Sequence, residues 1–210
     1  MLITETEVEL KYTIADPRAL GVIVAACEAP EVWFRQTNHY LDDADRSLRQ
    51  ATIMLRAREI WFPPGTPGAG GKPPVTLTAK RRAASEGGLF TAVERSQVMT
   101  LDDWQDLAPH TVIPARGPLF DWLRGELAFG PLGRLGQTVT TRQKLSFGYF
   151  VLELDATTYP DGSSDLELEC ETFAPDLARE EIEGLLNRIG VAFAPSAEGK
   201  YARFLARGGA

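Results

Sequence analysis

Cysteine and histidine are scarce in this sequence, with two of each among 210 residues. Cys27 and Cys170 lie far apart, so they form neither a disulfide framework nor the close spacing of a zinc site. We expect both to be free, buried thiols. The scarcity excludes small disulfide-rich secreted domains and metal proteins that bind through Cys and His.

Long apolar runs are also lacking, since no stretch approaches the roughly 20 residues that a membrane-spanning helix needs. The first residues, MLITETEVELKY, are acidic and alternating, unlike a signal or transit peptide. We therefore expect a cytoplasmic protein. The formal net charge of −7 argues against nucleic acid or an anionic membrane as a partner. An anionic substrate would need a local basic site that overcomes this balance.

The composition is that of one folded domain over residues 1–210, with 44% hydrophobic and 24% charged residues. Alternation predicts eight strands, at about 5–13, 33–43, 53–62, 75–82, 90–99, 135–146, 149–158 and 164–173. Helices are predicted at about 16–28, 100–107, 118–127, 176–189 and 198–207. The connections between strands are mostly short or hairpin-like, which favours antiparallel pairing.

Charged residues fall on one face of nearly every predicted strand, because residues two apart point to the same side. In the first strand Glu7, Glu9 and Lys11 share a face, and the residues between them are apolar. Acidic pairs lie on the first, seventh and eighth strands, and basic pairs lie on the third, fourth and sixth. The later pairs are Arg56 with Arg58, Lys80 with Arg82, Arg142 with Lys144, Glu153 with Asp155, and Glu167 with Glu169.

Two architectures explain these faces. In an open sheet or sandwich the charged faces meet solvent, and alternation alone favours this arrangement. In a closed barrel wrapped by helices, the apolar faces point outward and the charged faces meet in the bore. Segregation of the signs by strand, and the dominance of Arg and Glu on these faces, favour the barrel. We therefore predict an α+β fold: a closed eight-stranded antiparallel β-barrel, or tunnel, with helices packed outside.

A bore with a basic wall and an acidic wall suits a polyanion bound beside a divalent cation. Guanidinium groups make bidentate contacts with phosphate oxygens. Mg²⁺ and Mn²⁺ prefer carboxylate oxygens together with substrate phosphates and water. So many like charges facing one another are tolerated only in a water-filled bore.

Short motifs on the predicted strands follow one another in a specific order. Glu7, Glu9 and Lys11 form a Glu-x-Glu-x-Lys pattern. Later landmarks are Tyr40-Leu-Asp42, Leu55-Arg56-Ala-Arg58, Leu77-Thr78-Ala-Lys80, Glu94, Thr141-Arg142, Leu154-Asp155, Glu167-Leu-Glu169 and Gly199-Lys200-Tyr201. In this order the motifs resemble those of the CYTH superfamily, also called triphosphate tunnel metalloenzymes. Two positions depart from its pattern: Asp43 stands where threonine is usual, and Ala92 where arginine is common.

The resemblance implies an enzyme that hydrolyses the terminal phosphate of a triphosphate, with Mg²⁺ or Mn²⁺ as cofactor. It also implies that a C-terminal helix plugs one end of the tunnel and brings Lys200 to the substrate. The expected metal ligands are Glu7, Glu9 and Glu169. The expected substrate-binding residues are Lys11, Arg56, Arg58, Lys80, Arg82, Glu94, Arg142 and Lys144. Lys200, Asp155 and Glu167 are the expected catalytic residues, the two carboxylates completing a second metal position or orienting the attacking water.

Several alternatives stay open at this point. Inorganic triphosphate is the least demanding substrate, because the residues named above all address phosphates; thiamine triphosphate hydrolysis and a class IV type of adenylate cyclase follow. A polyphosphate- or nucleotide-binding module without turnover is a further alternative, although it would have no use for the carboxylates. Glu153 and Glu171 are expected at the rim or in solvent. We expect either a monomer or a homodimer.

Overall fold

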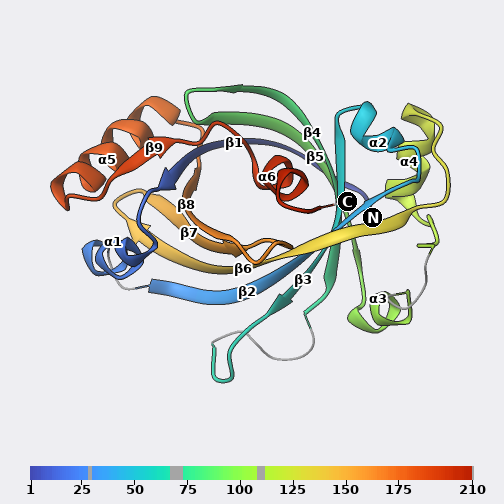
Figure 1. The fold of residues 1–210 in the computed structure, drawn as a ribbon, viewed down its shortest axis with the longest axis horizontal. Helices are drawn as coiled ribbons and strands as arrows, with labels where there is room; N and C mark the ends of the chain where they lie inside the picture. Colours follow the sequence, from blue (N-terminus) through green and yellow to red (C-terminus); the bar gives the residue numbers. More distant parts are fainter. Residues whose placement is uncertain (28–29, 67–72, 108–111, 210) are drawn as a thin grey trace.

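The structure, a computed structural model, describes residues 1–27, 30–66, 73–107 and 112–209 (Figure 1). The described residues form nine strands and six α-helices, with a 3-10 turn at Pro17–Ala19. The strands are β1 Ile3–Ile14, β2 Pro30–Asp42, β3 Ile53–Trp61, β4 Val75–Glu86, β5 Leu89–Met99, β6 Gly133–Phe147, β7 Phe150–Thr158, β8 Ser164–Glu171 and β9 Phe193–Pro195. The helices are α1 Leu20–Ala26, α2 Ser47–Gln50, α3 Leu101–Leu107, α4 Pro118–Glu126, α5 Pro175–Arg188 and α6 Lys200–Ala206.

The first eight strands close into a barrel. Hydrogen bonding follows the order β5-β4-β3-β2-β6-β7-β8-β1, and β5 pairs again with β1. Each of these pairs is antiparallel. Closure removes the free sheet edges that would otherwise be open to pairing with another chain. The predicted closed, eight-stranded antiparallel barrel is confirmed, and β9 adds a short strand beside β1.

Apolar residues of the barrel strands point outward and pack under helices. On one side Leu10 and Leu168 lie in a buried cluster with Ile182 and Leu185 of α5. On the other side, barrel residues such as Leu77 pack against α3 and α4. Because successive side chains of a strand alternate between its two faces, the charged neighbours of these residues point into the bore.

The last helix, α6, lies within the ring of strands, whereas α1, α3, α4 and α5 lie outside it (Figure 1). Phe204 is fully buried and packs against Tyr40 of β2, with the ring centroids 4.4 Å apart. A bulge in β6 at Gly136 admits this ring, because φ there is +148° and a Cβ atom would lie 3.1 Å from Phe204. The predicted helical plug is confirmed.

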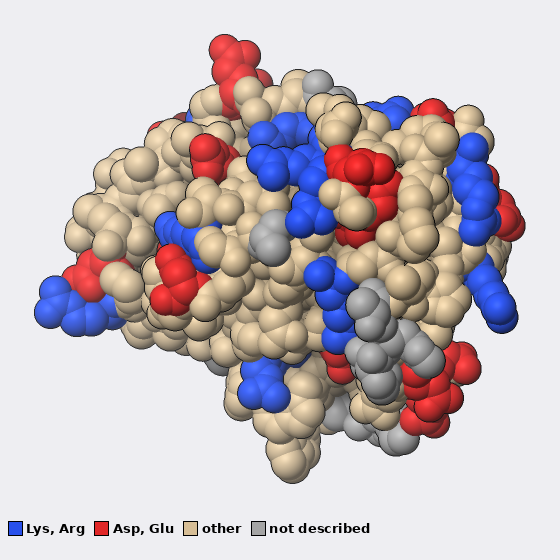
Figure 2. Space-filling model, turned by 45° about the vertical axis from the view of Figure 1, so that its right-hand side comes forward, with Lys and Arg blue, Asp and Glu red and all other residues tan. Residues whose placement is uncertain are grey.

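The outer surface shows no single dominant charge on the face in Figure 2. There, Lys and Arg side chains lie in small groups beside Asp and Glu side chains, with uncharged surface between them. Over the described part of the chain, no helix is long and apolar enough to cross a membrane.

Candidate functional site

A cavity of about 450 Å³ occupies the barrel next to α6. Among the described residues, its lining includes eight basic and six acidic side chains. The basic residues are Lys11, Arg49, Arg56, Arg58, Lys80, Arg82, Arg142 and Lys200, and the acidic residues are Glu7, Glu9, Glu153, Asp155, Glu169 and Glu171. The cavity thus has a positive formal charge although the chain carries −7.

The two signs occupy opposite sides of the barrel. In a ring of eight strands, those four places apart face each other, so β3 and β4 lie across from β8 and β7. The first pair carries Arg56, Arg58, Lys80 and Arg82, and the second pair carries the carboxylates of Glu153, Asp155, Glu169 and Glu171. A basic and an acidic wall are therefore present, but Arg142 of β6, predicted on the basic wall, lies on the acidic side, bonded to Asp155 and Glu169.

On the acidic side, Glu169 is surrounded by three cations. Its Oε1 lies 2.6 Å from both Lys11 Nζ and Lys200 Nζ, and its Oε2 lies 2.7 Å from an Nη atom of Arg142. Burial alone would raise the pKa of Glu169, but the three cations outweigh burial and hold the pKa well below its usual value. This carboxylate is ionised, and its charge is compensated inside the barrel.

Asp155 forms a bidentate ion pair with Arg142, which fixes both side chains on the acidic side of the cavity. Nε and one Nη atom of Arg142 donate to its two oxygens at 2.7 and 2.6 Å. Lys200 Nζ lies 2.9 Å from the same carboxylate. Burial would raise the pKa of Asp155, but Lys200 and Arg142 outweigh it and lower the pKa.

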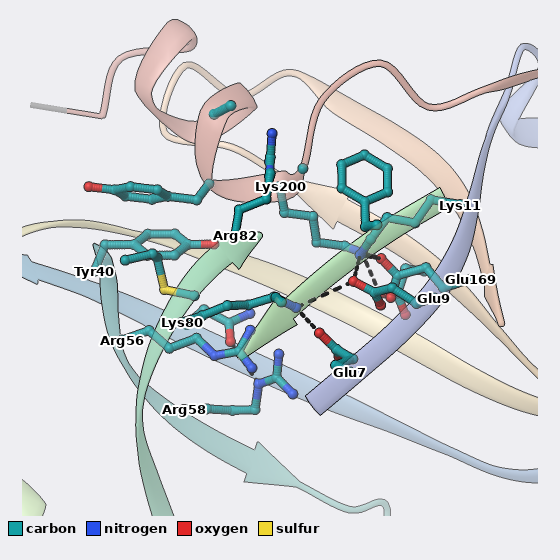
Figure 3. Close-up of a pocket in the computed structure, with 18 of the residues that line it drawn as sticks. Glu7, Glu9, Lys11, Tyr40, Arg56, Arg58, Lys80, Arg82, Glu169 and Lys200 are labelled. Carbon is teal, nitrogen blue, oxygen red and sulfur yellow. Dashed lines mark hydrogen bonds and ion pairs between the residues drawn. The ribbon is translucent and has the colours of Figure 1, made fainter. Parts of the chain in front are cut away.

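Glu7 and Glu9 of β1 point toward Lys80 of β4, and all three line the cavity (Figure 3). Lys80 Nζ contacts Glu7 Oε2 and lies 3.4 Å from Glu9 Oε1. Glu9 also lies 2.7 Å from Lys11 Nζ. Burial raises the pKa of Glu9, and Lys11 only partly offsets that effect. The two lysines thus do not fully compensate the negative charge of Glu9.

On the basic side, Arg56 and Arg58 are poorly compensated. Arg58 Nε donates to Asn38 at 2.8 Å, and within the described residues it has no carboxylate within 4.0 Å. Burial, with repulsion from Arg56 and Arg142, lowers the pKa of Arg58 to about 9. Nε of Arg56 is buried and has no hydrogen-bond partner in the described structure. Both guanidinium groups face the cavity: Arg58 has no paired carboxylate among the described residues, and Arg56 has only Glu94, at 3.9 Å.

The CYTH domain profile matches residues 5–196, which cover all eight barrel strands. The chain belongs to the CYTH family. No curated protein is significantly similar to it in sequence.

Solved structures with the same fold are distant in sequence. A protein from Hippeastrum, named as a candidate adenylyl cyclase with a dominant triphosphatase activity, superposes with a TM-score of 0.80 at 22% identity, over 95% of each chain. A candidate adenylate cyclase from Bacillus halodurans gives 0.68 at 22% identity, over 95% of this chain and 98% of that one. A protein of Pyrococcus horikoshii gives 0.61 at 19% identity, with the same coverage. At these identities the likeness concerns the fold.

Most of the residues predicted from the CYTH motifs meet in the cavity. Those that line it are Glu7, Glu9, Lys11, Arg56, Arg58, Lys80, Arg82, Arg142, Asp155, Glu169 and Lys200. Glu94, Lys144 and Glu167 do not line it. Glu94 lies 3.1 Å from Lys80 Nζ, and Lys144 pairs with Glu153 at 2.9 Å at a more exposed position. Glu167 lies behind the lining, bonded to Lys200.

Some lining residues were not predicted from the sequence. Glu153 and Glu171, expected at the rim, line the cavity, and Glu153 contacts Arg142. Gln36, Asn38 and Tyr40 also line it, all from one face of β2. Their even spacing was a usable signal, but uncharged residues gave no reason to prefer one face of that strand. Arg49 on α2 carried no periodic signal at all.

A divalent cation fits the chemistry of this cavity, because Glu7, Glu9 and Glu169 offer hard carboxylate oxygens on one side of it. Even so, no group of three or more His, Cys, Asp or Glu side chains in the described ranges is arranged to hold a metal ion. The carboxylates are instead joined by the ammonium groups of Lys11 and Lys80. A metal would have to compete with these lysines, which could then turn to the phosphates.

Proposed function

We propose that this CYTH protein hydrolyses the terminal phosphate of a triphosphate, with inorganic triphosphate as the first candidate substrate. The observation that carries the proposal is the pair of cavity-facing guanidinium groups, Arg56 and Arg58, which lack full partners and lie opposite a wall of carboxylates. An oligophosphate supplies the missing anion, and its metal supplies the missing cation beside Glu9.

Phosphoryl transfer asks a protein mainly to position the phosphates and to neutralise their charge. In our proposal Lys11, Arg56, Arg58, Lys80 and Arg142 bind the phosphate chain. Glu7, Glu9 and Glu169 hold Mg²⁺ or Mn²⁺, which supplies charge neutralisation at the phosphate oxygens when bound. Asp155 keeps Arg142 and Lys200 oriented through the contacts described above, and Lys200 approaches the substrate from α6. Arg82, exposed at the cavity and stacked 5.1 Å from the ring of Phe90, binds the outer end of the chain.

A second candidate is an organic triphosphate, as in thiamine triphosphatases or adenylate cyclases of the family. The specific observation is an apolar part of the lining, formed by Met54, Phe90, Leu205 and the rings of Tyr40 and Tyr201. Such a surface suits an organic group attached to the triphosphate. Within the cavity lining that the structure describes, no set of hydrogen-bonding groups selects one ring over another, so inorganic triphosphate stays the first candidate.

The proposal is tested by measuring phosphate and pyrophosphate release from inorganic triphosphate, thiamine triphosphate and ATP, each with Mg²⁺ and with Mn²⁺. From each inorganic triphosphate we expect one orthophosphate and one pyrophosphate. Glu9→Gln and Arg56→Ala should lose most turnover with the barrel still folded. Release of pyrophosphate and cyclic AMP from ATP would instead indicate an adenylate cyclase. Tight binding of all three compounds without turnover would favour a binding module. Near-wild-type release by both variants would overturn the site assignments.

The cytoplasmic location and the choice between monomer and homodimer stay predictions from the sequence.

A further inference from the structure

Glu167 is as buried as Asp155, with 1% of each side chain exposed, but unlike Asp155 and Glu169 it does not line the cavity. Its Oε2 accepts hydrogen bonds from Lys200 at 2.7 Å and from Arg203 at 2.8 Å. Its Oε1 accepts one from Ser196 at 2.9 Å, and the Ser196 hydroxyl lies 3.0 Å from that of Thr13. Both oxygens are engaged by groups of the chain itself. Glu167 is thus poorly placed to bind a metal or to orient a water, the roles expected from the sequence.

Arg203 is the residue that anchors Glu167. It follows Lys200 by three residues on α6, so the two side chains share a helix face. Its Nε donates to the Tyr159 hydroxyl at 2.9 Å and lies 3.0 Å from Asp165. One Nη atom donates to Glu167, and the other donates to the Glu198 carbonyl oxygen at 2.7 Å. All three nitrogens of the guanidinium therefore bind, and two of them tie α6 to β8 and to Tyr159, the residue that follows β7.

Lys200 receives its position from the same network. Its Nζ lies 2.6 Å from Glu169, 2.7 Å from Glu167 and 2.9 Å from Asp155. Glu169 and Asp155 line the cavity and would meet the ligand, whereas Glu167 would keep its partners when the ligand binds. Glu167 is the fixed member of the three.

We infer that Arg203 is a positioning residue: it fixes Glu167, and Glu167 holds the ammonium group of Lys200 at the cavity. This inference rests on the proposed function, in which Lys200 meets the phosphates. Without Arg203, the charge of Glu167 would be shared with one cation instead of two. Lys200 would then be drawn toward Glu167 and away from the substrate.

A double-mutant cycle tests this chain of contacts. Arg203→Met is made in the wild type and in Lys200→Met, and kcat and KM for phosphate release are measured. We expect Arg203→Met to lower kcat by about tenfold or more in the wild type, and by less than about twofold in Lys200→Met, because its effect passes through Lys200. Arg203→Lys, which keeps the charge but not the fork, should restore part of the loss.

The same cycle is run on the dissociation constant of inorganic triphosphate, measured by calorimetry with a chelator present so that metal-dependent turnover is blocked. If the wild type releases no phosphate, the proposed function fails, and this second cycle still decides the positioning role. Arg207→Met is the matched control, because Arg207 contacts Asp165 at 3.4 Å and stacks on Tyr159, but has no bond to Glu167 in the described structure. We expect it to change neither measurement in either background.

Glu167→Gln separates positioning from metal binding, because the amide keeps an acceptor for Lys200 and Arg203. We expect an unchanged Mg²⁺ activation constant and a kcat reduced by less than about tenfold. A tenfold weaker response to Mg²⁺ would show Glu167 to be a metal ligand and would overturn the inference. Equal effects of Arg203→Met with and without the Lys200 side chain, in both cycles, would overturn it as well.

Discussion

Arg58 and Arg142 are both arginines of the cavity, but their surroundings give them opposite roles in stability. Arg142 fills its donors with Asp155 and Glu169. Arg58 has the amide oxygen of Asn38 and two arginines nearby. A buried cation with paired carboxylates stabilises the fold when its partners would otherwise be unpaired, whereas an unpaired one costs free energy. Arg142 therefore stabilises the acidic wall, and Arg58 is available to bind a ligand.

Replacing each arginine by methionine should separate these roles. Arg58→Met should change the free energy of unfolding by less than about 1 kcal/mol, but weaken inorganic triphosphate binding by about thirtyfold, or about 2 kcal/mol. Arg142→Met should lower the free energy of unfolding by about 3 kcal/mol, because the buried carboxylates of Asp155 and Glu169 both lose its hydrogen bonds. Urea unfolding and calorimetry measure the two quantities. Equal destabilisation by both substitutions would contradict the distinction.

The sequence predicted which side chains enter the bore, because strand parity is local, but it did not predict how they pair. Arg58 and Arg142 look alike in their own strands. Their difference comes from the carboxylates of β7, which pairs with β6, and of β8, the next strand; both lie across the barrel from β3 and β4. For the same reason Glu167, whose parity matches that of Glu169, was predicted at the site and instead lies behind its lining.

Asp155 predicts how stability depends on pH. Its pKa is lowered in the fold, so the folded state holds the ionised form more firmly than the unfolded chain does. The contribution is therefore present above the unfolded pKa of about 3.9 and is lost as pH falls through the folded pKa. Asp155→Asn should lower the free energy of unfolding by about 3 kcal/mol at neutral pH.

That deficit should shrink as pH falls from about 5 toward about 2, because the wild-type carboxyl becomes protonated too. Urea unfolding of both proteins across this range measures it. Glu180→Gln, at an exposed position inside α5, should leave the free energy of unfolding nearly unchanged throughout. A deficit that is constant down to the lowest pH would show that Asp155 acts through its shape and not its charge.

At the scale of elements, the strands were predictable and two short elements were not. The eight barrel strands are long and alternate, so the pattern repeats often enough to locate them. α2 spans Ser47–Gln50, too short for a helical period, and β9 spans Phe193–Pro195. α2 is held instead by hydrogen bonds from its backbone to a side chain that precedes it in the sequence. Asp42 accepts from the backbone N–H groups of Asp43, Leu48 and Arg49.

Asp42 therefore holds the element that carries Arg49 to the cavity. Its side chain is 1% exposed, and Asp42→Ala would leave buried N–H groups without an acceptor. We expect a loss of about 2–3 kcal/mol in the free energy of unfolding. Asp45→Ala in the same turn is the control, because Asp45 is exposed and its backbone, not its side chain, accepts from Gln50. Equal effects of the two substitutions would mean that α2 is held in some other way.

At the scale of the whole molecule, the chain is acidic and its cavity is not. The formal charge is −7, yet the cavity lining has more basic than acidic side chains among the described residues. The excess of basic side chains in the cavity lowers the stability of the folded state through mutual repulsion, and a bound anion relieves that repulsion. The barrel without a ligand lacks an anion that balances these basic side chains, so its free energy of unfolding should depend strongly on the ligand.

Inorganic triphosphate with Mg²⁺ should therefore stabilise the barrel. At about 100 times its dissociation constant, a ligand that binds only the folded state adds about 2.7 kcal/mol, which raises Tm by about 5–10 °C in a chain of this size. Thermal unfolding measures the shift, with orthophosphate as the control, because one phosphate cannot span Arg56, Arg58 and Lys80 together. A chelator should reduce the shift without abolishing it, since the basic side chains still bind the anion. An unchanged Tm with all ligands would mean that these charges serve the fold alone, as they would on a solvated outer face.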